Sequence, residues 1–302
     1  MLTVPFCTIR LHLVIVTLPI TYFLSTYLKG LMNYTEYIPA ELLKPYVKCY
    51  YLYESGTDVV FEDKAFATGC VEMMFNLGGG KWQTCTDGHF TINPAIELWG
   101  QIIQPLSFKS LGNNKMLGIR FHPQTASIFL NEDMNLFNNQ VTDLASVTGK
   151  MVTTLHERLL ETGLIQQRIE LVENYLLGRL AVFEKKLDKV GLIGHVITEL
   201  KQEAFFDNID NLASRYGITS RYLQKLFLQY TGLTPKLYSK INRFQNSLQL
   251  IAKNKRSLTD IAYECGYFDQ SHFIREFKSF TNSTPSRFNM ANTSAILASP
   301  NK

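Results

Sequence analysis

The sequence lacks the clustered residues that metal sites and many enzyme active sites require. Its five cysteines are scattered along the chain: Cys7, Cys49, Cys70, Cys85 and Cys265. They include no C-x2-C pair, so neither a structural zinc site nor a disulfide framework is indicated, and we expect reduced, mostly buried thiols. The chain also has no H-x-H pair, no nucleophile elbow and no phosphate-binding glycine loop. We therefore expect no catalytic residues, no bound metal and no cofactor.

The chain has little that fits a membrane span. Its dominant apolar run, residues 11–24, is broken by His12 and Pro19 and at best resembles the core of a signal peptide. The composition changes after residues 1–31, where a sequence typical of a soluble domain begins. We interpret residues 1–31 as an over-extended start with the true start at Met32, the alternative being a membrane anchor or signal. We expect a cytoplasmic protein with no membrane contact.

Charge is divided unevenly between the two ends of the chain. The 302 residues, 46% of them hydrophobic, are enough for two domains with packed cores. Residues 191–290 contain seven Lys and six Arg against eight Asp and Glu, a net charge of +5. Because the whole chain carries +4 and Lys302 adds one, residues 1–190 carry −2. A basic module on a slightly acidic body fits phosphate contact at one end of the molecule, although the excess alone is modest evidence.

The stretch from residue 208 to residue 288 contains one pattern twice. The first copy has Leu212-Ala213, Gly217, Phe227, Gly232 and Pro235. The second copy has Ile261-Ala262, Gly266, Phe277, Asn282 and Pro285. The glycine and the phenylalanine are ten positions apart in the first copy and eleven in the second, so the length difference lies in the turn. The stretch is an internal repeat of one supersecondary unit.

Each copy predicts a helix, a glycine-marked turn and a second helix. Asn208 and Ser257 are suited to cap the first helices, and Thr219 and Asp269 those that follow. The glycine four residues after each alanine stands where a helix ends in a left-handed conformation. Between the copies, a threonine and a proline predict the start of a long helix that runs to about Ala252.

The second helix of each copy has an apolar face and an outward face. The predicted outward residues are Arg221, Gln224, Lys225, Gln270, Ser271, Ile274 and Arg275. A helix-turn-helix places its second helix, the recognition helix, in the DNA major groove, where Arg and Gln pair bidentately with guanine and adenine. The long helix between the copies, roughly 25 Å at 1.5 Å per residue, could hold two recognition helices about one DNA turn apart. A helical bundle with no nucleic-acid role is the alternative.

About 95 residues at the C-terminus closely resemble the AraC/XylS family of bacterial transcription regulators. The residues that match the family signature are Ile261, Ala262, Gly266, Tyr267, Gln270, Ser271, Phe273, Phe277, Lys278 and Pro285. Asn282 departs from it where glycine is usual, and Ser247 where alanine is usual; asparagine tolerates positive φ, so we expect the turn to survive. The resemblance implies that the seven outward residues face the major groove of double-stranded DNA. RNA polymerase, a small-molecule effector and a second copy of the chain are further partners that it leaves open.

Residues 33–149 are rich in short strands separated by glycine turns. The predicted strands are Tyr46 to Tyr53, Cys70 to Leu77, Ile96 to Trp99 and Leu117 to Phe121. This spacing favours a small antiparallel barrel or sandwich. The stretches GCVEMMFNLGGG, WGQIIQPLSFKSLG and MLGIRFHPQTASIFL resemble, more loosely, a cupin-like sensing domain found ahead of this DNA-binding module.

The predicted barrel offers aromatic side chains but no catalytic cluster. Phe75, Trp82, Trp99 and Phe121 would either line a ligand cavity or form ordinary core. A metal-dependent cupin requires clustered histidine and carboxylate ligands, but Glu72 has no histidine partner nearby in the sequence. A non-catalytic pocket is therefore favoured, and a barrel enzyme on a DNA tether is the alternative.

The segment between the two domains is predicted to be helical. The expected helices are Gln124 to Leu130, Val141 to Thr162 and Leu164 to Lys186. The last carries an apolar stripe of Ile165, Ile169, Val172, Leu176, Leu180 and Phe183. Such a helix often pairs two protomers in this family, and packing onto its own barrel is the alternative.

We predict an α+β multidomain fold: an antiparallel, cupin-like β-barrel or sandwich, a helical connector and an all-α double helix-turn-helix. The expected segments are a start region 1–31, a sensing domain 32–149, a connector 150–188, a DNA-binding domain 189–290 and a tail 291–302. The predicted function is that of a sequence-specific, DNA-binding transcription regulator. A DNA-repair alkyl acceptor with a similar module would need a tight cysteine pair, whereas the gaps from Cys7 to Cys85 are 42, 21 and 15 residues.

Overall fold

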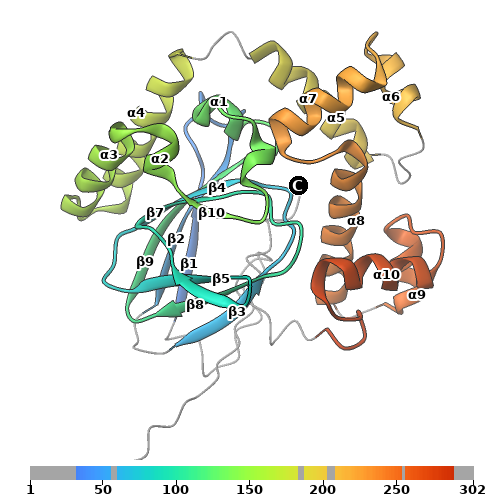
Figure 1. The fold of residues 1–302 in the computed structure, drawn as a ribbon, viewed down its shortest axis with the longest axis horizontal. Helices are drawn as coiled ribbons and strands as arrows, with labels where there is room; N and C mark the ends of the chain where they lie inside the picture. The colour runs from blue at the N-terminus through green and yellow to red at the C-terminus, as the bar shows by residue number, and fades with distance from the viewer. Residues whose placement is uncertain (1–31, 56–59, 183–186, 203–207, 254–255, 289–302) are drawn as a thin grey trace, which may run out of the picture.

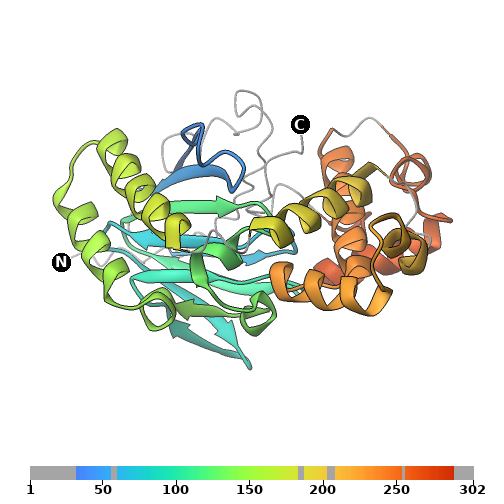
Figure 2. The ribbon, with the colours of Figure 1, turned by 90° about the horizontal axis from the view of Figure 1, so that it is seen from above.

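A computed structural model describes residues 32–55, 60–182, 187–202, 208–253 and 256–288. The predictions for residues 1–31 and for the tail 291–302 concern segments that lie outside these described ranges. A β-rich N-terminal part lies beside an all-helical C-terminal part (Figures 1 and 2). The predicted fold class, antiparallel β followed by a helical region, is confirmed.

The N-terminal part consists of two antiparallel sheets. The strands are β1 Met32–Tyr37, β2 Val47–Ser55, β3 Phe61–Ala65, β4 Glu72–Asn76, β5 Lys81–Thr86, β6 His89–Ile92, β7 Ile96–Trp99, β8 Leu106–Leu111, β9 Asn114–Phe121 and β10 Val141–Asp143. One sheet has the order β1-β2-β9-β4-β7-β10, and the other has the order β3-β8-β5-β6. Side chains from facing surfaces, such as Met74 and Met116 of the first sheet and Trp82 and Phe108 of the second, form one buried cluster between them.

The sequence located the buried strands β2, β4, β7 and β9 but missed the other six of the described strands. β6 is largely exposed, so it has no apolar run to reveal it. The prediction of a helix from Val141 is wrong at its first three residues. Val141–Asp143 instead pairs with β7, opposite Trp99, Leu98 and Glu97. The Asp143 side chain then accepts a hydrogen bond from the Ala145 N–H, so the helix begins only at Leu144.

Short helices cover the outer face of the six-stranded sheet. They are α1 Ala126–Leu130, the 3-10 helix η1 Met134–Phe137, α2 Leu144–Thr148, α3 Lys150–Glu161 and α4 Ile165–Val182. On α4 the middle of the predicted stripe is buried within its own chain, because Ile169, Val172 and Leu176 belong to the core cluster that joins the sheet to the helices; Ile165 and Leu180 are half-buried. The three buried residues are therefore not free to pair two protomers. The alternative of packing within the chain holds here, and Phe183 lies outside the described residues.

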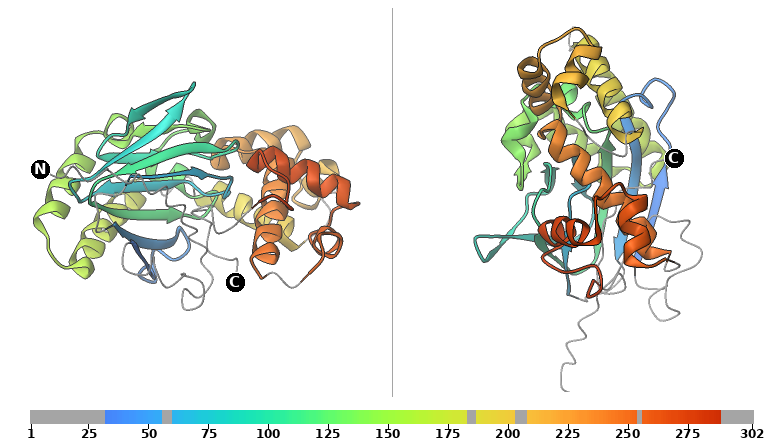
Figure 3. Two further views of the ribbon diagram at one scale, coloured as in Figure 1. Left: turned by 90° about the horizontal axis from the view of Figure 1, so that it is seen from below. Right: turned by 90° about the vertical axis from the view of Figure 1, so that its right-hand side faces the viewer.

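The C-terminal part contains α5 Leu187–Gln202, α6 Ile209–Arg215, α7 Ser220–Thr231, α8 Pro235–Ala252, α9 Leu258–Glu264 and α10 Gln270–Thr281. The pairs α6–α7 and α9–α10 are the two predicted helix-turn-helix units. They lie at opposite ends of α8, and Figure 3 shows the same arrangement from two further sides. With 18 residues, α8 is about 27 Å long. The predicted start after Thr234 and the predicted end at Ala252 are both confirmed.

Candidate nucleic-acid interface

The two helix-turn-helix units are built by equivalent hydrogen bonds. Each predicted cap accepts a backbone N–H with its side chain: Asn208 from Asp210, Thr219 from Tyr222, Ser257 from Asp260 and Asp269 from His272. The turn glycines adopt φ of 65° at Gly217 and 75° at Gly266, the left-handed region that glycine enters without strain. The local sequence therefore determines where each of the four helices begins.

A side-chain bond also ties each recognition helix to the helix before it. In the first unit the Ser220 hydroxyl donates to the Asp210 carboxylate. At the matching positions of the second unit, the Thr259 hydroxyl donates to the Gln270 side-chain carbonyl at 3.1 Å. Different residue types thus make the same link between the first turns of both helices. The link also orients Gln270, one of the predicted base-reading residues.

The predicted reading residues gather on one face of each recognition helix. Arg221, Gln224 and Lys225 are all exposed on α7, and their spacing of three and four residues puts them on one side. On α10, Ser271 and Arg275 are exposed, while Gln270 and Ile274 are half-buried. The opposite faces carry the buried residues Leu223, Phe227, Phe273 and Phe277. The structure therefore brings both predicted sets together as outward faces, one near each end of α8.

Tight packing at α8 fixes the spacing between the units. The Ser247 hydroxyl is buried and donates to the Phe244 carbonyl at 2.7 Å, so a residue larger than the usual alanine fits without an unpaired polar group. The Phe244 ring contacts those of Phe277 and Phe280, with centroids 5.4 and 4.9 Å apart. Such aromatic contacts hold the second unit against the helix.

The first unit is also anchored on the N-terminal part. The Asn138 side-chain amide donates to the Gly232 carbonyl at 2.7 Å, and the Gln229 amide donates to Asp133 at 2.7 Å. Asp133 and Asn138 lie on either side of η1, against which α7 packs. The position of α7 is therefore tied to the N-terminal part by packing and by hydrogen bonds.

A segment of the N-terminal part, residues 66–69, lies against α8 and the end of the second unit. The Ala67 carbonyl accepts a hydrogen bond from the Gln245 amide, and a Cβ at Gly69 would stand 3.5 Å from the Tyr238 ring. The Phe66 and Phe288 rings meet at a centroid distance of 5.7 Å. This segment leads into β4, whose first residue lies inside the barrel. We call residues 66–69 the coupling segment.

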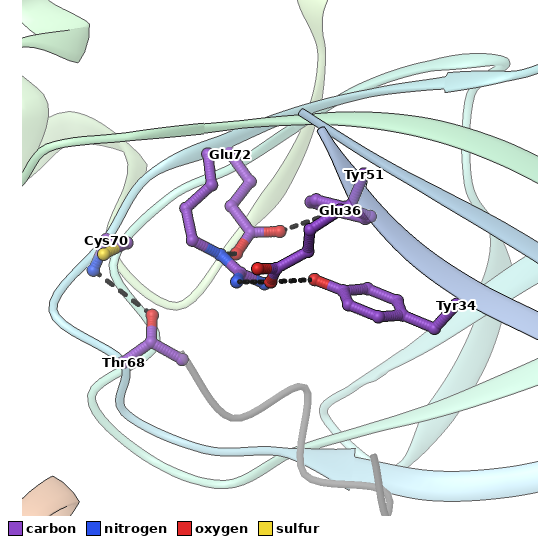
Figure 4. A network of polar contacts seen from close by, with 7 residues as sticks. Tyr34, Glu36, Tyr51, Thr68, Cys70 and Glu72 are labelled. Atoms are coloured by element: carbon purple, nitrogen blue, oxygen red, sulfur yellow. Dashed lines mark hydrogen bonds and ion pairs between the residues drawn. The ribbon is translucent and has the colours of Figure 1, made fainter. Parts of the chain in front are cut away.

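The interior between the sheets holds a charged network that the sequence did not predict. Arg120 is fully buried; its Nε donates to Glu72 at 2.7 Å, and its Nη1 donates to Glu36 at 3.5 Å. The Tyr51 hydroxyl donates to Glu72, and the Tyr34 hydroxyl donates to Glu36 at 2.7 Å. Figure 4 shows Tyr34, Glu36, Tyr51 and Glu72 converging, with the loop residues Thr68 and Cys70 beside them.

The network keeps its guanidinium charged. Burial alone would lower the pKa of Arg120, but the charge of Glu72 and other neighbours raises it well above its ordinary value. Burial raises the pKa of Tyr51, and the Glu72 charge raises it further, so the phenol stays a donor. Among the described residues, Arg120 Nη2 has no hydrogen-bond partner. The available sequence signal was a single charge inside each apolar strand, MLGIRF and CVEMMF.

The aromatic residues named from the sequence fall on two different faces. Trp82 and Trp99 are buried between the sheets, where Trp82 stacks on Phe108 with centroids 5.2 Å apart. Phe75 and Phe121 instead belong to the core between the six-stranded sheet and the helices. For Phe75 and Phe121 the alternative of ordinary core therefore holds, because the two faces of a strand alternate and these side chains point away from the barrel interior.

Glu97 is a further buried carboxyl group in the barrel. Burial raises the pKa of Glu97 to about 7, although Trp99 Nε1 at 2.5 Å and Asn93 Nδ2 at 3.0 Å stabilise its charge.

Across the described part of the chain, no group of three or more His, Cys, Asp or Glu side chains is placed to hold a metal ion. Within the same residues, no helix is long and apolar enough to cross a membrane.

Comparisons with known proteins match the two parts separately. Residues 212–291 match a helix-turn-helix domain family, and residues 35–143 match a domain-of-unknown-function family (DUF6597). The HTH-type transcriptional activator RhaS of Escherichia coli O9:H4 (strain HS) is 30% identical over 112 residues, which are 36% of this chain and 40% of that protein. RhaS of Escherichia coli O157:H7 (strain EC4115 / EHEC) matches to the same extent. This chain thus spans about two fifths of the length of these curated relatives.

Solved structures give a partial likeness. ToxT of Vibrio cholerae aligns over 85% of this chain and 97% of its own, with 15% identity and a TM-score of 0.43. A DNA-binding transcriptional dual regulator of Escherichia coli K-12 is 27% identical over 30% of this chain and 82% of its own, with a TM-score of 0.28. The C-terminal region is a tandem helix-turn-helix domain. Over this region the chain is similar to the transcriptional activator RhaS, in agreement with the resemblance seen in the sequence.

Proposed function

We propose that the protein is a sequence-specific DNA-binding transcription regulator, with two recognition helices that enter successive major grooves. The observation that carries this proposal is the pair of outward faces on α7 and α10, held near the two ends of α8 by equivalent bonds. Arg and Gln side chains on these faces have the chemistry that discriminates guanine and adenine. The proposed readers are Arg221, Gln224, Lys225, Gln270, Ser271, Ile274 and Arg275.

In this proposal, residues 32–149 form the sensing domain, residues 150–188 the connector and residues 189–290 the DNA-binding domain. A regulator of this kind is not an enzyme, and it acts where the genome lies, in the cytoplasm. RNA polymerase is the partner of the activator form. A second copy of the chain would have to bind through a surface other than the buried stripe of α4.

Selection from a random pool of DNA duplexes by the full chain tests the proposed function. The expected result is enrichment of two short motifs about one helical turn apart, bound at least roughly 1,000-fold more tightly than random DNA. Affinities are compared at a fixed salt concentration, because phosphate contacts make binding steeply salt-dependent. A pool that remains random after repeated rounds contradicts the proposal.

A small-molecule effector is proposed to act from the barrel through the coupling segment. Two buried donors in the barrel, Arg120 Nη2 and Trp82 Nε1, have no partner among the described residues and could bind a polar ligand. The adjoining strand β4 carries Glu72, and the chain just before it touches α8 through Gln245. A ligand that rearranges the Arg120–Glu72 pair would therefore act, through the coupling segment, on α8, the helix that joins the two helix-turn-helix units.

The coupling is tested by a screen of small molecules for thermal stabilisation of the full chain, followed by DNA affinity with each stabilising compound. We expect a compound that changes the DNA affinity of the wild type. The same compound should still stabilise Gln245→Leu, but it should leave the DNA affinity of that variant unchanged. Glu173→Ala serves as the control, because it removes the side-chain oxygen that accepts from the Ala40 N–H, a contact away from α8. A response that persists in Gln245→Leu contradicts the proposed route.

A further inference from the structure

The turn of the second helix-turn-helix unit contains one residue that the first unit lacks. The backbone bonds locate it: Ile218 N–H donates to Ala213 at 3.2 Å, and Tyr267 N–H donates to Ala262 at 2.9 Å. Ile218 and Tyr267 therefore occupy equivalent positions. In the first unit the capping residue Thr219 follows at once, whereas in the second Phe268 stands before the capping Asp269. Phe268 is the inserted residue.

The inserted phenylalanine is not used to build the domain. Its side chain is 76% exposed, whereas the neighbouring Tyr267 is 2% exposed and packs on the Phe273 ring at 5.1 Å. A phenyl ring that is exposed in a short turn buries little apolar area and makes no polar bond, so it adds little to the stability of the turn. A structural role would therefore be met as well by a polar turn residue, and the phenyl ring is free for an external contact.

The place of Phe268 in the unit determines which partner it faces. It directly precedes the first turn of α10, where Gln270 and Ser271 lie, and the N-terminal end of a recognition helix is the part that approaches base edges. The outward side chains that follow it are the polar Gln270 and Ser271 and, one turn further along, the basic Arg275, which suit DNA better than an apolar protein interface. The apolar group that a major groove offers to a phenyl ring is the C5-methyl of thymine.

We propose that Phe268 contacts a thymine methyl group, so that the second unit prefers thymine at one position for which the first unit has no corresponding reader. This inference rests on the proposed function, because it requires α10 to enter the major groove. The insertion moves the aromatic group just ahead of the capping residue. The contact would lie at the edge of the half-site read by Gln270, Ser271 and Arg275.

Replacement of thymine by uracil tests the contact, because it removes only the methyl group. The probes are synthetic duplexes of the selected sequence with each thymine of the second half-site exchanged in turn. At one position we expect the full-length wild type to lose about fourfold in affinity, the value of one buried methyl group. Phe268→Ala should bind the thymine duplex about tenfold more weakly and make no distinction between thymine and uracil there. Phe268→Leu should retain part of the distinction.

Leu160→Ala is the matched control, because Leu160 is also an exposed apolar residue, 51% exposed, but lies on α3 in the N-terminal part. Thermal unfolding midpoints equal to wild type establish that the variants are folded. If Phe268→Ala keeps the wild-type preference for thymine at every position, or loses transcription without losing DNA affinity, the inference is overturned. If the wild type itself prefers no DNA sequence, the proposed function is contradicted. If the wild type selects a motif but binds the thymine and uracil duplexes equally, only this inference is contradicted.

Discussion

The two helix-turn-helix units share a backbone plan but differ in how they are held. The first unit, α6–α7, packs on η1 and is linked to the N-terminal part by Asn138 and Asp133. The second unit, α9–α10, is held by α8 and by ring contacts around Phe288. The recognition helix of the first unit is thus itself bonded to the N-terminal part, whereas the second unit touches that part only after α10, through the Phe66–Phe288 ring contact, among the contacts described here. Under the proposed function, we expect a ligand in the barrel to change the spacing of the two recognition helices rather than either helix alone.

The cores of the units differ at one equivalent position, and this difference gives the largest predicted effect. Leu226 is buried in the first unit, whereas Glu276 is buried in the second and accepts from Arg243 Nη2 at 3.0 Å. Arg243→Met leaves that carboxylate buried without its main partner, which should destabilise the second unit by about 3 kcal/mol. Lys240 Nζ, 3.9 Å away, recovers little of this because it is further from the carboxylate. Amide hydrogen exchange in α10, with α7 as the internal reference, measures the effect.

A double variant sharpens the same comparison. Glu276→Leu combined with Arg243→Met replaces the buried ion pair by two apolar residues and gives the second unit the leucine that the first has at Leu226. Well-packed apolar replacements of a buried ion pair are often neutral or stabilising. We expect the exchange protection of α10 to return to wild type or above it. Continued loss of protection in the double variant would mean that Arg243 acts through its contact with the Tyr267 ring, 5.2 Å away, rather than through Glu276.

The helix ends offer a second test, because α7 and α10 end in the same left-handed conformation with different neighbours. Gly232 has φ of 77°, and a Cβ there would lie 2.8 Å from Asn138 Oδ1 and 3.1 Å from the Met134 carbonyl. Gly232→Asn should therefore cost about 1–3 kcal/mol by overpacking the contact between the two parts. The urea midpoint of the full chain measures the loss.

The physical cause of that loss is tested by Asn138→Ala in the same background. If steric crowding by Asn138 is responsible, the double variant should be more stable than Gly232→Asn alone, despite the lost bond to the Gly232 carbonyl. Equal destabilisation with and without Asn138 would place the strain on the Met134 backbone instead.

The readers of the two units give a third test. Arg221→Ala and Arg275→Ala should each cost about 1–3 kcal/mol on the selected DNA and relax the preference at one base position, with a smaller effect on random DNA. The two relaxed positions should lie about one helical turn apart, because the arginines are on different recognition helices. Selection with each variant and affinities across a salt series measure both effects. If Arg275→Ala loses affinity equally on both DNAs, Arg275 contacts phosphate and the placement of α10 in the groove is wrong.

The parts of the fold that depend on nearby residues were predictable from the sequence. Caps such as Thr219 and Asp269 act on N–H groups three residues away, and left-handed turns need only a residue that tolerates positive φ. The outward faces also followed from helical spacing, although their contact with DNA stays a prediction. A periodic stripe, in contrast, indicates that a face is buried and not what covers it, so the partner of α4 could not be chosen from the sequence.

The interior of the barrel depended on information that local sequence does not carry. Glu72 and Arg120 are 48 positions apart and meet because β4 pairs with β9 in one particular register. A search for histidine partners near Glu72 in the sequence could not find an arginine on another strand. The same register places Phe75 on the helix side of the sheet, opposite to the expected cavity.

The smallest predicted effect concerns the end of the second recognition helix. Asn282 has φ of 59° and is exposed, and its N–H donates to the Lys278 carbonyl at 2.8 Å as glycine could equally do. Two terms oppose each other in Asn282→Gly: glycine relieves the left-handed conformation of its strain, but it also gives the unfolded chain more freedom. We expect a net change within about 0.5 kcal/mol, against the larger loss for the reciprocal change at Gly232. Urea unfolding of the two variants side by side measures the difference; an equal and large loss in both would mean that the two helix ends are held alike, and the contrast between the docked and the linker-held unit would not stand.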